Sequence, residues 1–252
     1  MLYDLFARAY NQTWGGAASP YLAQALTALQ HIALHQIPAD GRILDLACGP
    51  GRLAYLLTER GYRVSGVDGS SAMIHYAKEN APQADFMVAD VRDFTLPGTV
   101  HAVVETGDGL NHIPTLGDLR RVFANVYACL EPDGLFAFDF LTPERFIKGR
   151  NIDLSVQGES SFFVMQQRCQ PKALFATMDF TIFYQQDDDS WQRSDVLTTQ
   201  HGYADEVVRG ALSEAGFVNI RRWAATDLGI TIAVHEVAFY TCHKPRVDTT
   251  KA

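Results

Sequence analysis

An apolar stretch early in this 252-residue chain contains an acid and closes on two glycines, a pattern suited to binding a small ligand. Residues 43–51 read Ile-Leu-Asp-Leu-Ala-Cys-Gly-Pro-Gly, and a helical pattern follows at residues 52–60. Glycine has no Cβ atom, so Gly49 and Gly51 leave room for a ligand against the backbone. Asp45 is costly in a buried strand unless hydrogen-bond donors reach it, and an α-amino group is such a donor. A strand, a glycine turn and a helix predict the start of a nucleotide-binding α/β unit.

The same turn also fits a dinucleotide fingerprint, because residues 49–54 read Gly-Pro-Gly-Arg-Leu-Ala. A dinucleotide site holds a pyrophosphate on the N–H groups at the start of a helix. Asp45 would repel that phosphate, and Pro50 removes one N–H donor from the turn. These residues therefore favour a ligand that is cationic near the turn and carries no phosphate. S-adenosylmethionine fits through its ammonium and sulfonium groups, and a turn without any ligand is the plainer alternative.

Further apolar stretches follow, two of which also end in acids. Residues 62–68 end in Asp68, residues 85–90 end in Asp90, and residues 101–107 form a fourth stretch. An acid at the tip of the second strand accepts hydrogen bonds from ribose hydroxyls. Asp68 could instead cap the helix that follows it. Asp90 is placed to accept from an adenine amino group, so the order and spacing of the acids are more specific than the glycines alone.

These segments resemble the successive motifs of class I S-adenosylmethionine-dependent methyltransferases. The matching residues are Asp-Leu-Ala-Cys-Gly-Pro-Gly-Arg at 45–52, Gly-Val-Asp-Gly-Ser-Ser-Ala-Met at 66–73, Asp90, and the turn into a fifth strand at 130–139. The resemblance covers about residues 40 to 142. It departs at Ala47, where the family usually has a glycine, although a small residue there should still let the cofactor approach.

The resemblance implies S-adenosylmethionine as the cofactor and a set of residues around it. Asp45 would lie near the amino group and the glycines near the methionine part. Asp68 would hold the ribose, and Asp90 with Val91 the adenine edge. The full set of expected cofactor contacts is Tyr3, Tyr10, Asp45, Ala47, Gly49, Gly51, Asp68, Gly69, Met73, Asp90, Val91 and Thr106.

The charge and composition of the chain argue against several classes of binding partner. A net charge of −8 and a pI near 5.4 argue against non-specific binding to nucleic acid or an anionic membrane, which needs basic patches. The sequence has neither an apolar run of membrane-spanning length nor the basic start of a signal peptide, so we expect a cytoplasmic protein. The four cysteines show neither zinc-ligand nor disulfide-framework spacing. We therefore expect no metal.

Periodicity predicts an α/β, doubly wound Rossmann-like fold with a seven-stranded sheet. Strand and helix alternate from residue 43 to residue 140, with an amphipathic helix over 118–130. A helix over 205–215 leads into an antiparallel C-terminal hairpin. The other expected elements are helices over 2–14 and 20–37 and hairpin strands over 217–223 and 234–242.

An inserted three-stranded antiparallel sheet is expected after the fifth core strand. Residues 161–169, 173–185 and 191–201 are long, alternating and rich in aromatic and β-branched side chains, with turn-like residues between them. We accordingly divide the chain into four parts. These are a helical cover (1–38), a cofactor-binding core (39–154 and 202–244), an inserted substrate platform (155–201) and a tail (245–252).

The inserted sheet favours a small acceptor molecule. It resembles the platform of amino-sugar and other small-amine N-methyltransferases, as do Tyr3, Tyr10 and the run Asp-Gly-Leu-Asn-His at 108–112. The resemblance implies that the N-terminal helix folds over the cofactor, although both tyrosines could be core aromatics. The sheet could also, or only, serve to form a homodimer.

A histidine is the natural helper for methyl transfer, because an amine must arrive neutral or lose a proton and a hydroxyl needs a base. We expect catalytic roles for His112 and Tyr10, and substrate contacts from Asn111, His112 and His201. A loop histidine that only caps backbone is the alternative for His112. Methylation of a small amine is therefore the predicted function. The alternatives are O-methylation of a small hydroxyl compound and non-catalytic binding of an adenosine ligand; a nicotinamide-linked reductase is disfavoured by Asp45 and Asp90.

Overall fold

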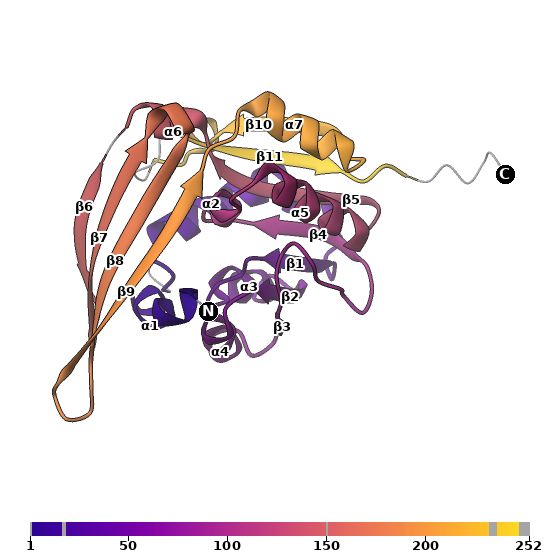
Figure 1. Cartoon of the computed structure of the whole chain (residues 1–252). Helices are drawn as coiled ribbons and strands as arrows, with labels where there is room; N and C mark the ends of the chain where they lie inside the picture. Colours follow the sequence, from indigo (N-terminus) through magenta and orange to yellow (C-terminus); the bar gives the residue numbers. More distant parts are fainter. Residues whose placement is uncertain (1, 17–18, 150, 232–235, 247–252) are drawn as a thin grey trace.

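The computed structural model describes residues 2–16, 19–149, 151–231 and 236–246 (Figure 1). A seven-stranded sheet has the strand order β10-β11-β5-β4-β1-β2-β3. Strand β11 is antiparallel to both β5 and β10, and the other neighbouring pairs are parallel. The expected doubly wound fold with an antiparallel C-terminal end is thus confirmed. The strands of this sheet are β1 Arg42–Leu46, β2 Arg63–Asp68, β3 Asp85–Val88, β4 Val100–Glu105, β5 Leu130–Leu141, β10 Val218–Ala224 and β11 Val237–His243.

Helices cover both faces of the large sheet, each with its own apolar core. On one face, side chains of α2 and α3 pack with Ile43 and Val104. On the other, side chains of α5 and α7 pack with Leu44 and Val103. Neighbouring residues of a strand point to opposite faces, which explains why these strands are apolar throughout. The helices flanking the sheet are α2 Pro20–Ile32, α3 Arg52–Thr58, α4 Ser71–Asn80, α5 Leu116–Cys129 and α7 Asp205–Glu214.

The N-terminal helices are shorter than expected. The segment over 2–14 consists of a 3-10 turn, η1 (Leu2–Leu5), and a short helix, α1 (Ala7–Gln12). The segment over 20–37 divides into α2 and a 3-10 turn, η2 (Leu34–Gln36), because Ala33 leaves the helical conformation. Ser19 caps α2 by accepting a hydrogen bond from Leu22 N–H at 3.4 Å.

The inserted sheet has four strands, so the expectation of three was wrong. The additional strand is β6 (Ile152–Gln157), and it pairs along one edge with β7. Its sequence alternates apolar and polar residues, which is the signal that could have found it. Because β6 begins at Ile152, the expected boundary at residue 155 cuts through a strand. The other strands are β7 Ser161–Gln170, β8 Phe175–Gln185 and β9 Trp191–His201.

The N-terminal segment joins the inserted sheet to the large one. Helix α1 contacts both β7 and α4, and Figure 1 shows it between the two sheets. Phe6 lies in an apolar cluster with Phe163 and Phe180 of the inserted sheet, at ring-centroid distances of 5.4 and 4.6 Å. Burial of these rings fixes where the segment lies. Dimerisation through the inserted sheet stays a prediction.

Two expected segments extend beyond the described residues. Strand β11 begins at Val237, and residues 234 and 235 of the expected strand over 234–242 lie outside the described part of the chain. Residues 247–252 of the expected tail also lie outside it. Among the described residues, no helix is both long and apolar enough to cross a membrane.

Candidate active site

Carboxyl groups gather at the carboxyl ends of the parallel strands. Asp45 in β1, Glu105 at the end of β4 and Asp139 in β5 are almost fully buried, with exposures of 2%, 0% and 0%. Asp68 ends β2, and Asp108 follows β4. Carboxyl ends of parallel strands lie at one edge of a sheet, which is where α/β folds bind ligands. The fold therefore concentrates carboxyl groups at this edge.

The two glycines of the turn, Gly49 and Gly51, have different surroundings. Gly49 and Gly51 both have positive φ, 52° and 75°. A Cβ atom on Gly49 would lie 3.8 Å from the ring of Tyr10, whereas one on Gly51 would lie 2.9 Å from Ala77. Gly51 therefore permits α3 to pack against α4, and Gly49 faces Tyr10. Ala47 also has positive φ, 52°, so the residue that replaces a glycine keeps a conformation typical of glycine.

The acids fit the cofactor through two buried oxygen atoms. Asp45 Oδ2 and Glu105 Oε2 have no hydrogen-bond partner among the residues that the structure describes. Burial raises the pKa of Asp45 to about 8, and it raises the pKa of Glu105 well above its usual range. A buried carboxylate without a donor is unstable, and an ammonium group supplies both donors and positive charge. The residues present thus suit the amino group of S-adenosylmethionine.

Asp68 both builds the turn and remains able to accept from a ligand. Its Oδ2 accepts from Gly49 N–H at 2.9 Å and its Oδ1 from Ser70 N–H at 2.8 Å. Each carboxylate oxygen has a second acceptor position, so hydrogen bonds from ribose hydroxyls stay compatible with these contacts. Gly69 follows at the tip of β2, and the buried Met73 lies in the first turn of α4.

Asp90 forms an ion pair with a neighbouring arginine, Arg92. Its exposed carboxylate accepts from Arg92 Nε at 2.8 Å, and this hydrogen bond lowers the pKa of Asp90. Val91 is half-buried and packs against the core. Thr106 is half-buried directly after β4. The assignment of Asp90 and Val91 to the adenine edge, and of Thr106 to the cofactor, stays a prediction.

The N-terminal segment spans the site. Asp4 accepts hydrogen bonds from Ser70 Oγ at 2.6 Å and from Ala72 N–H at 3.1 Å, which ties η1 to the start of α4. Burial raises the pKa of Tyr10 well above its usual range, and the charges of Asp108 and Asp68 raise it further. Tyr10 therefore lies among the acids near the glycine turn, and its contact with the cofactor stays a prediction.

His112 lies in a hydrogen-bonded network rather than in an open loop. Its Nδ1 is 2.8 Å from Tyr3 Oη and 3.2 Å from Thr198 Oγ1, and its Nε2 is 3.5 Å from Gln200 Nε2. It ends the 3-10 turn η3 (Gly109–His112). Burial lowers the pKa of His112 to about 4. The ring is therefore neutral at pH 7, and both of its nitrogens already have protein neighbours.

Asn111 holds the backbone of the site together. Its Nδ2 donates to the backbone oxygens of His201 at 2.8 Å and Leu141 at 3.2 Å, and its Oδ1 accepts from Leu141 N–H at 2.8 Å. Asn111 is fully buried, so its amide links η3, β5 and β9 and leaves little capacity for a substrate. The ring of His201 packs against Phe175 at 5.0 Å, and Nε2 lies 3.3 Å from Thr199 Oγ1.

Sequence reasoning missed several polar residues at this edge. Glu105 and Asp139 lie in apolar stretches, where an isolated acid was the available signal. Thr198 and Gln200 lie on β9, and the sequence does not show which face of that strand meets the core. Asp108 lies in the run Asp-Gly-Leu-Asn-His at 108–112, where the sequence does not distinguish it from a turn residue.

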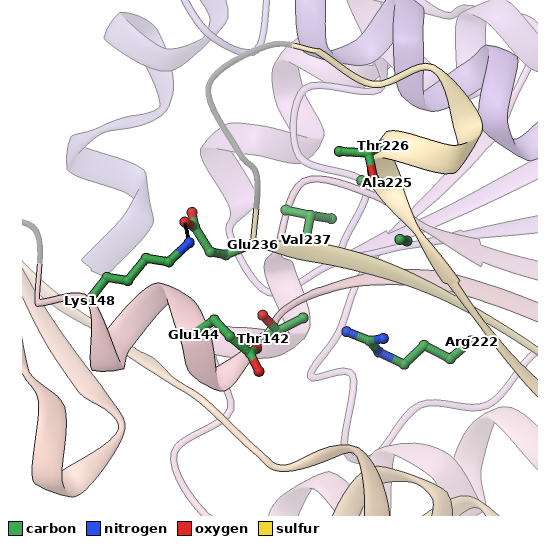
Figure 2. A pocket seen from close by; sticks show the side chains of 9 residues that line it. Thr142, Glu144, Lys148, Arg222, Ala225, Thr226, Glu236 and Val237 are labelled. Carbon is green, nitrogen blue, oxygen red and sulfur yellow. Dashed lines mark hydrogen bonds and ion pairs between the residues drawn. The ribbon is translucent and has the colours of Figure 1, made fainter.

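A cavity of about 220 Å³ lies away from these residues, beside α6 (Pro143–Ile147) and the adjoining ends of β10 and β11. Figure 2 shows Lys148 and Glu236 pointing toward one another across it, with Nζ and Oε1 at 2.5 Å. Glu144 and Arg222 also line it. The positive charges of Lys148 and Arg222 balance the negative charges of Glu144 and Glu236 in this cavity. The site at the ends of β1 and β4 is instead rich in acids. The described residues contain no cluster of three or more potential metal-ligating side chains.

Comparisons with known proteins agree with this geometry. Residues 43–134 match a family model described as a methyltransferase domain. A protein of Geobacillus sp. (strain WCH70) that carries a methyltransferase name is 30% identical over 225 residues, covering 86% of this chain and 89% of its own. A dTDP-3-amino-3,4,6-trideoxy-alpha-D-glucopyranose N,N-dimethyltransferase of Streptomyces venezuelae is 28% identical over 149 residues, covering 59% of this chain and 60% of its own.

A solved structure shares the whole fold. The S-adenosylmethionine-dependent methyltransferase from Clostridium acetobutylicum ATCC 824 has a TM-score of 0.77 and 19% identity, covering 97% of this chain and 100% of that one. The buried acids, the glycine turn and the matches in sequence lead to one family. This chain belongs to the S-adenosylmethionine-dependent methyltransferases, and S-adenosylmethionine is its cofactor.

Proposed function

We propose that this enzyme transfers a methyl group to an amine nitrogen of a small molecule. The observation that carries the proposal is the surplus of buried carboxyl groups. Asp45 suffices for the amino group of the cofactor, while the buried Glu105 and Asp139 and the half-buried Asp108 are further carboxyl groups at the same edge of the sheet. A cation beside these carboxyl groups favours their ionised form, and an amine is a cation at neutral pH.

The proton-accepting groups near the site also favour nitrogen over oxygen. When bound, S-adenosylmethionine supplies a methyl group that its sulfonium has already activated. The residues of this chain then need to orient the acceptor and manage its proton. Burial lowers the pKa of His112 to about 4, so the neutral ring is a weak base for a hydroxyl. We assign His112 and Tyr3 to positioning the acceptor, with Tyr10 beside the glycine turn.

The amino-sugar dimethyltransferase among the relatives supports this substrate class. The inserted sheet and the N-terminal segment form one side of the site, where the buried rings of Phe6, Phe163 and Phe180 hold the segment against the sheet. We propose that this side of the site accepts the carbon skeleton of a small amine. O-methylation of a small hydroxyl compound is the competing function.

The test is a screen with methyl-labelled S-adenosylmethionine. Purified enzyme is offered primary and secondary amines, amino-sugar nucleotides, and matched phenols and alcohols, with an acceptor-free reaction as the control. We expect label on an amine nitrogen, identified by mass spectrometry. Label on phenols or alcohols alone would assign the enzyme to O-methylation and reject the amine proposal.

A further inference from the structure

We propose that Asp108 binds the ammonium group of the acceptor and takes its proton before methyl transfer, with Gln200 holding the carboxylate in place. This inference rests on the proposed amine methylation, and it names the group that handles the amine. Asp108 immediately precedes η3, between the end of β4 and His112. It therefore stands between the cofactor-binding turn and the network of the inserted sheet.

The backbone around Asp108 is fixed to a buried carboxylate. Gly107 N–H donates to Asp139 Oδ2 and Asp108 N–H donates to Asp139 Oδ1, each at 2.8 Å. Asp139 also accepts from the hydroxyl of Tyr21 and is fully buried in β5. Asp108 has a φ of 57°, in the left-handed region that aspartate adopts more often than most residues. The two hydrogen bonds to Asp139 hold the backbone in this conformation.

Gln200 connects Asp108 to the inserted sheet. Its buried side chain lies on β9, and Nε2 donates a hydrogen bond to Asp108 Oδ2. The same nitrogen is 3.5 Å from His112 Nε2. Oδ1 of Asp108 accepts no hydrogen bond from any residue that the structure describes, so it can receive one from an ammonium group. Gln200 thereby orients the carboxylate without neutralising it.

The charges around Asp108 make it a suitable proton acceptor. Burial and the charge of Asp139 raise the pKa of Asp108 to about 7, while the hydrogen bond from Gln200 and the charge of Arg145 oppose that rise. Glu105 Oε2 is also buried without a partner among the described residues. The titratable groups that face Asp108 are Glu105, Asp139, Arg145, Tyr3, Tyr10 and, through Gln200, His112.

The proton transfer balances within the site. One N–H bond of the acceptor ammonium breaks and an O–H bond forms on Asp108, which leaves the nitrogen neutral with a lone pair. That lone pair forms the new N–C bond while the S–C bond of the methyl donor breaks with its electrons on sulfur. Asp108 then returns its proton to water, and the product ammonium leaves. A carboxyl with a pKa near the working pH is efficient in this role.

The first experiment measures ammonium binding without catalysis. The enzyme carries ¹³C-carboxyl aspartate, is saturated with S-adenosylhomocysteine and is titrated with n-butylammonium chloride. The signal lost in Asp108→Asn is that of Asp108. We expect it to titrate near neutral pH and to shift on adding n-butylammonium, while the exposed Asp179 does not respond. An Asp108 signal that n-butylammonium leaves unchanged would overturn the proposal.

The second experiment uses an amine accepted in the labelled-methyl screen. Asp108→Asn should lower kcat/KM about 100-fold or more, the usual contribution of a positioned acid or base, and leave affinity for S-adenosylhomocysteine within about threefold. Gln200→Leu should move the rising limb of the kcat/KM profile to higher pH, because it removes a hydrogen bond to the ionised carboxylate. A purely structural role would lower the rate without moving that limb. Asp179→Asn is the matched control.

The two experiments separate this inference from the proposed function. Binding of n-butylammonium at Asp108 without methylation of any amine would reject the proposed function and leave the ammonium site standing. Methylation of amines by Asp108→Asn at the wild-type rate would reject the role of Asp108 alone. Asp108→Glu, which keeps the charge, should recover part of the lost activity.

Discussion

The hydroxyl of Tyr3 lies 2.8 Å from His112 Nδ1 and 2.8 Å from Thr198 Oγ1. Three segments that are distant in sequence thus meet at one oxygen atom: η1, the turn after β4, and β9 of the inserted sheet. Burial raises the pKa of Tyr3 to about 12, so the hydroxyl keeps its proton at neutral pH. The N-terminal segment is therefore held against the turn after β4 and the inserted sheet at this hydroxyl group.

Removing this contact should slow the reaction more than it weakens cofactor binding. We expect His112→Ala to lower kcat on an accepted amine about 100-fold and Tyr3→Phe by a smaller factor, because both disturb the orientation of the acceptor. Calorimetry with S-adenosylhomocysteine should give nearly wild-type affinity for His112→Ala. Tyr55→Phe, which removes an exposed hydroxyl, is the control. A wild-type rate for His112→Ala would make His112 an ordinary turn residue.

Asp68→Ala should weaken binding of S-adenosylhomocysteine by about 1–3 kcal/mol, the cost of leaving hydrogen-bonded hydroxyls without an acceptor. The loss includes the contact with Gly49 N–H, which shapes the turn. Isothermal titration calorimetry measures it, with the exposed Asp85→Ala in β3 as the matched control. Full affinity in Asp68→Ala would exclude Asp68 from the cofactor site.

Binding of S-adenosylhomocysteine should strengthen as the pH rises from about 6 to about 7.5, by up to tenfold per pH unit. Burial raises the pKa of Asp45 to about 8 in the free enzyme, so this carboxyl is mostly protonated in that range. An ammonium group favours the ionised form, and binding must therefore release a proton. Calorimetry in buffers of different ionisation enthalpy counts the proton released.

Asp45→Asn supplies the control for this pH dependence. The variant carries no proton to release at this position, so its remaining affinity should vary much less with pH. An equal slope in the wild type and Asp45→Asn would assign the proton to another carboxyl of the site.

Ala47→Gly should change the free energy of unfolding by less than about 1 kcal/mol, because relief of the left-handed conformation offsets the greater freedom of glycine in the unfolded chain. Ala47 has a φ of 52°. Ala47→Val should instead cost about 1–3 kcal/mol, since a branched side chain tolerates this conformation poorly. Urea denaturation measures both, and Ala128→Val at an exposed position of α5 is the control. A neutral Ala47→Val would contradict the strain at this turn.

The sequence by itself determined the fold class and the cofactor. Strand, turn and helix signals are local. The apolar pattern of residues 43–51 predicts a buried strand, and the acids Asp45 and Asp68 predict a ligand that donates hydrogen bonds to them. Parallel strands place their carboxyl ends at one edge, so acids at those ends could be expected to meet there. The missed strand β6 is a local signal too, since Ile152, Leu154 and Val156 alternate with polar residues.

Only the tertiary structure decided which side chains meet around His112 and Asp108. His112 was the expected base, yet its neighbours Tyr3, Thr198 and Gln200 come from segments whose docking no local pattern reveals. We propose Asp108 as the base instead, because burial and the charge of Asp139 raise its pKa. Solvent exclusion and charge–charge proximity depend on the packing of distant segments, and the residue types alone do not specify them.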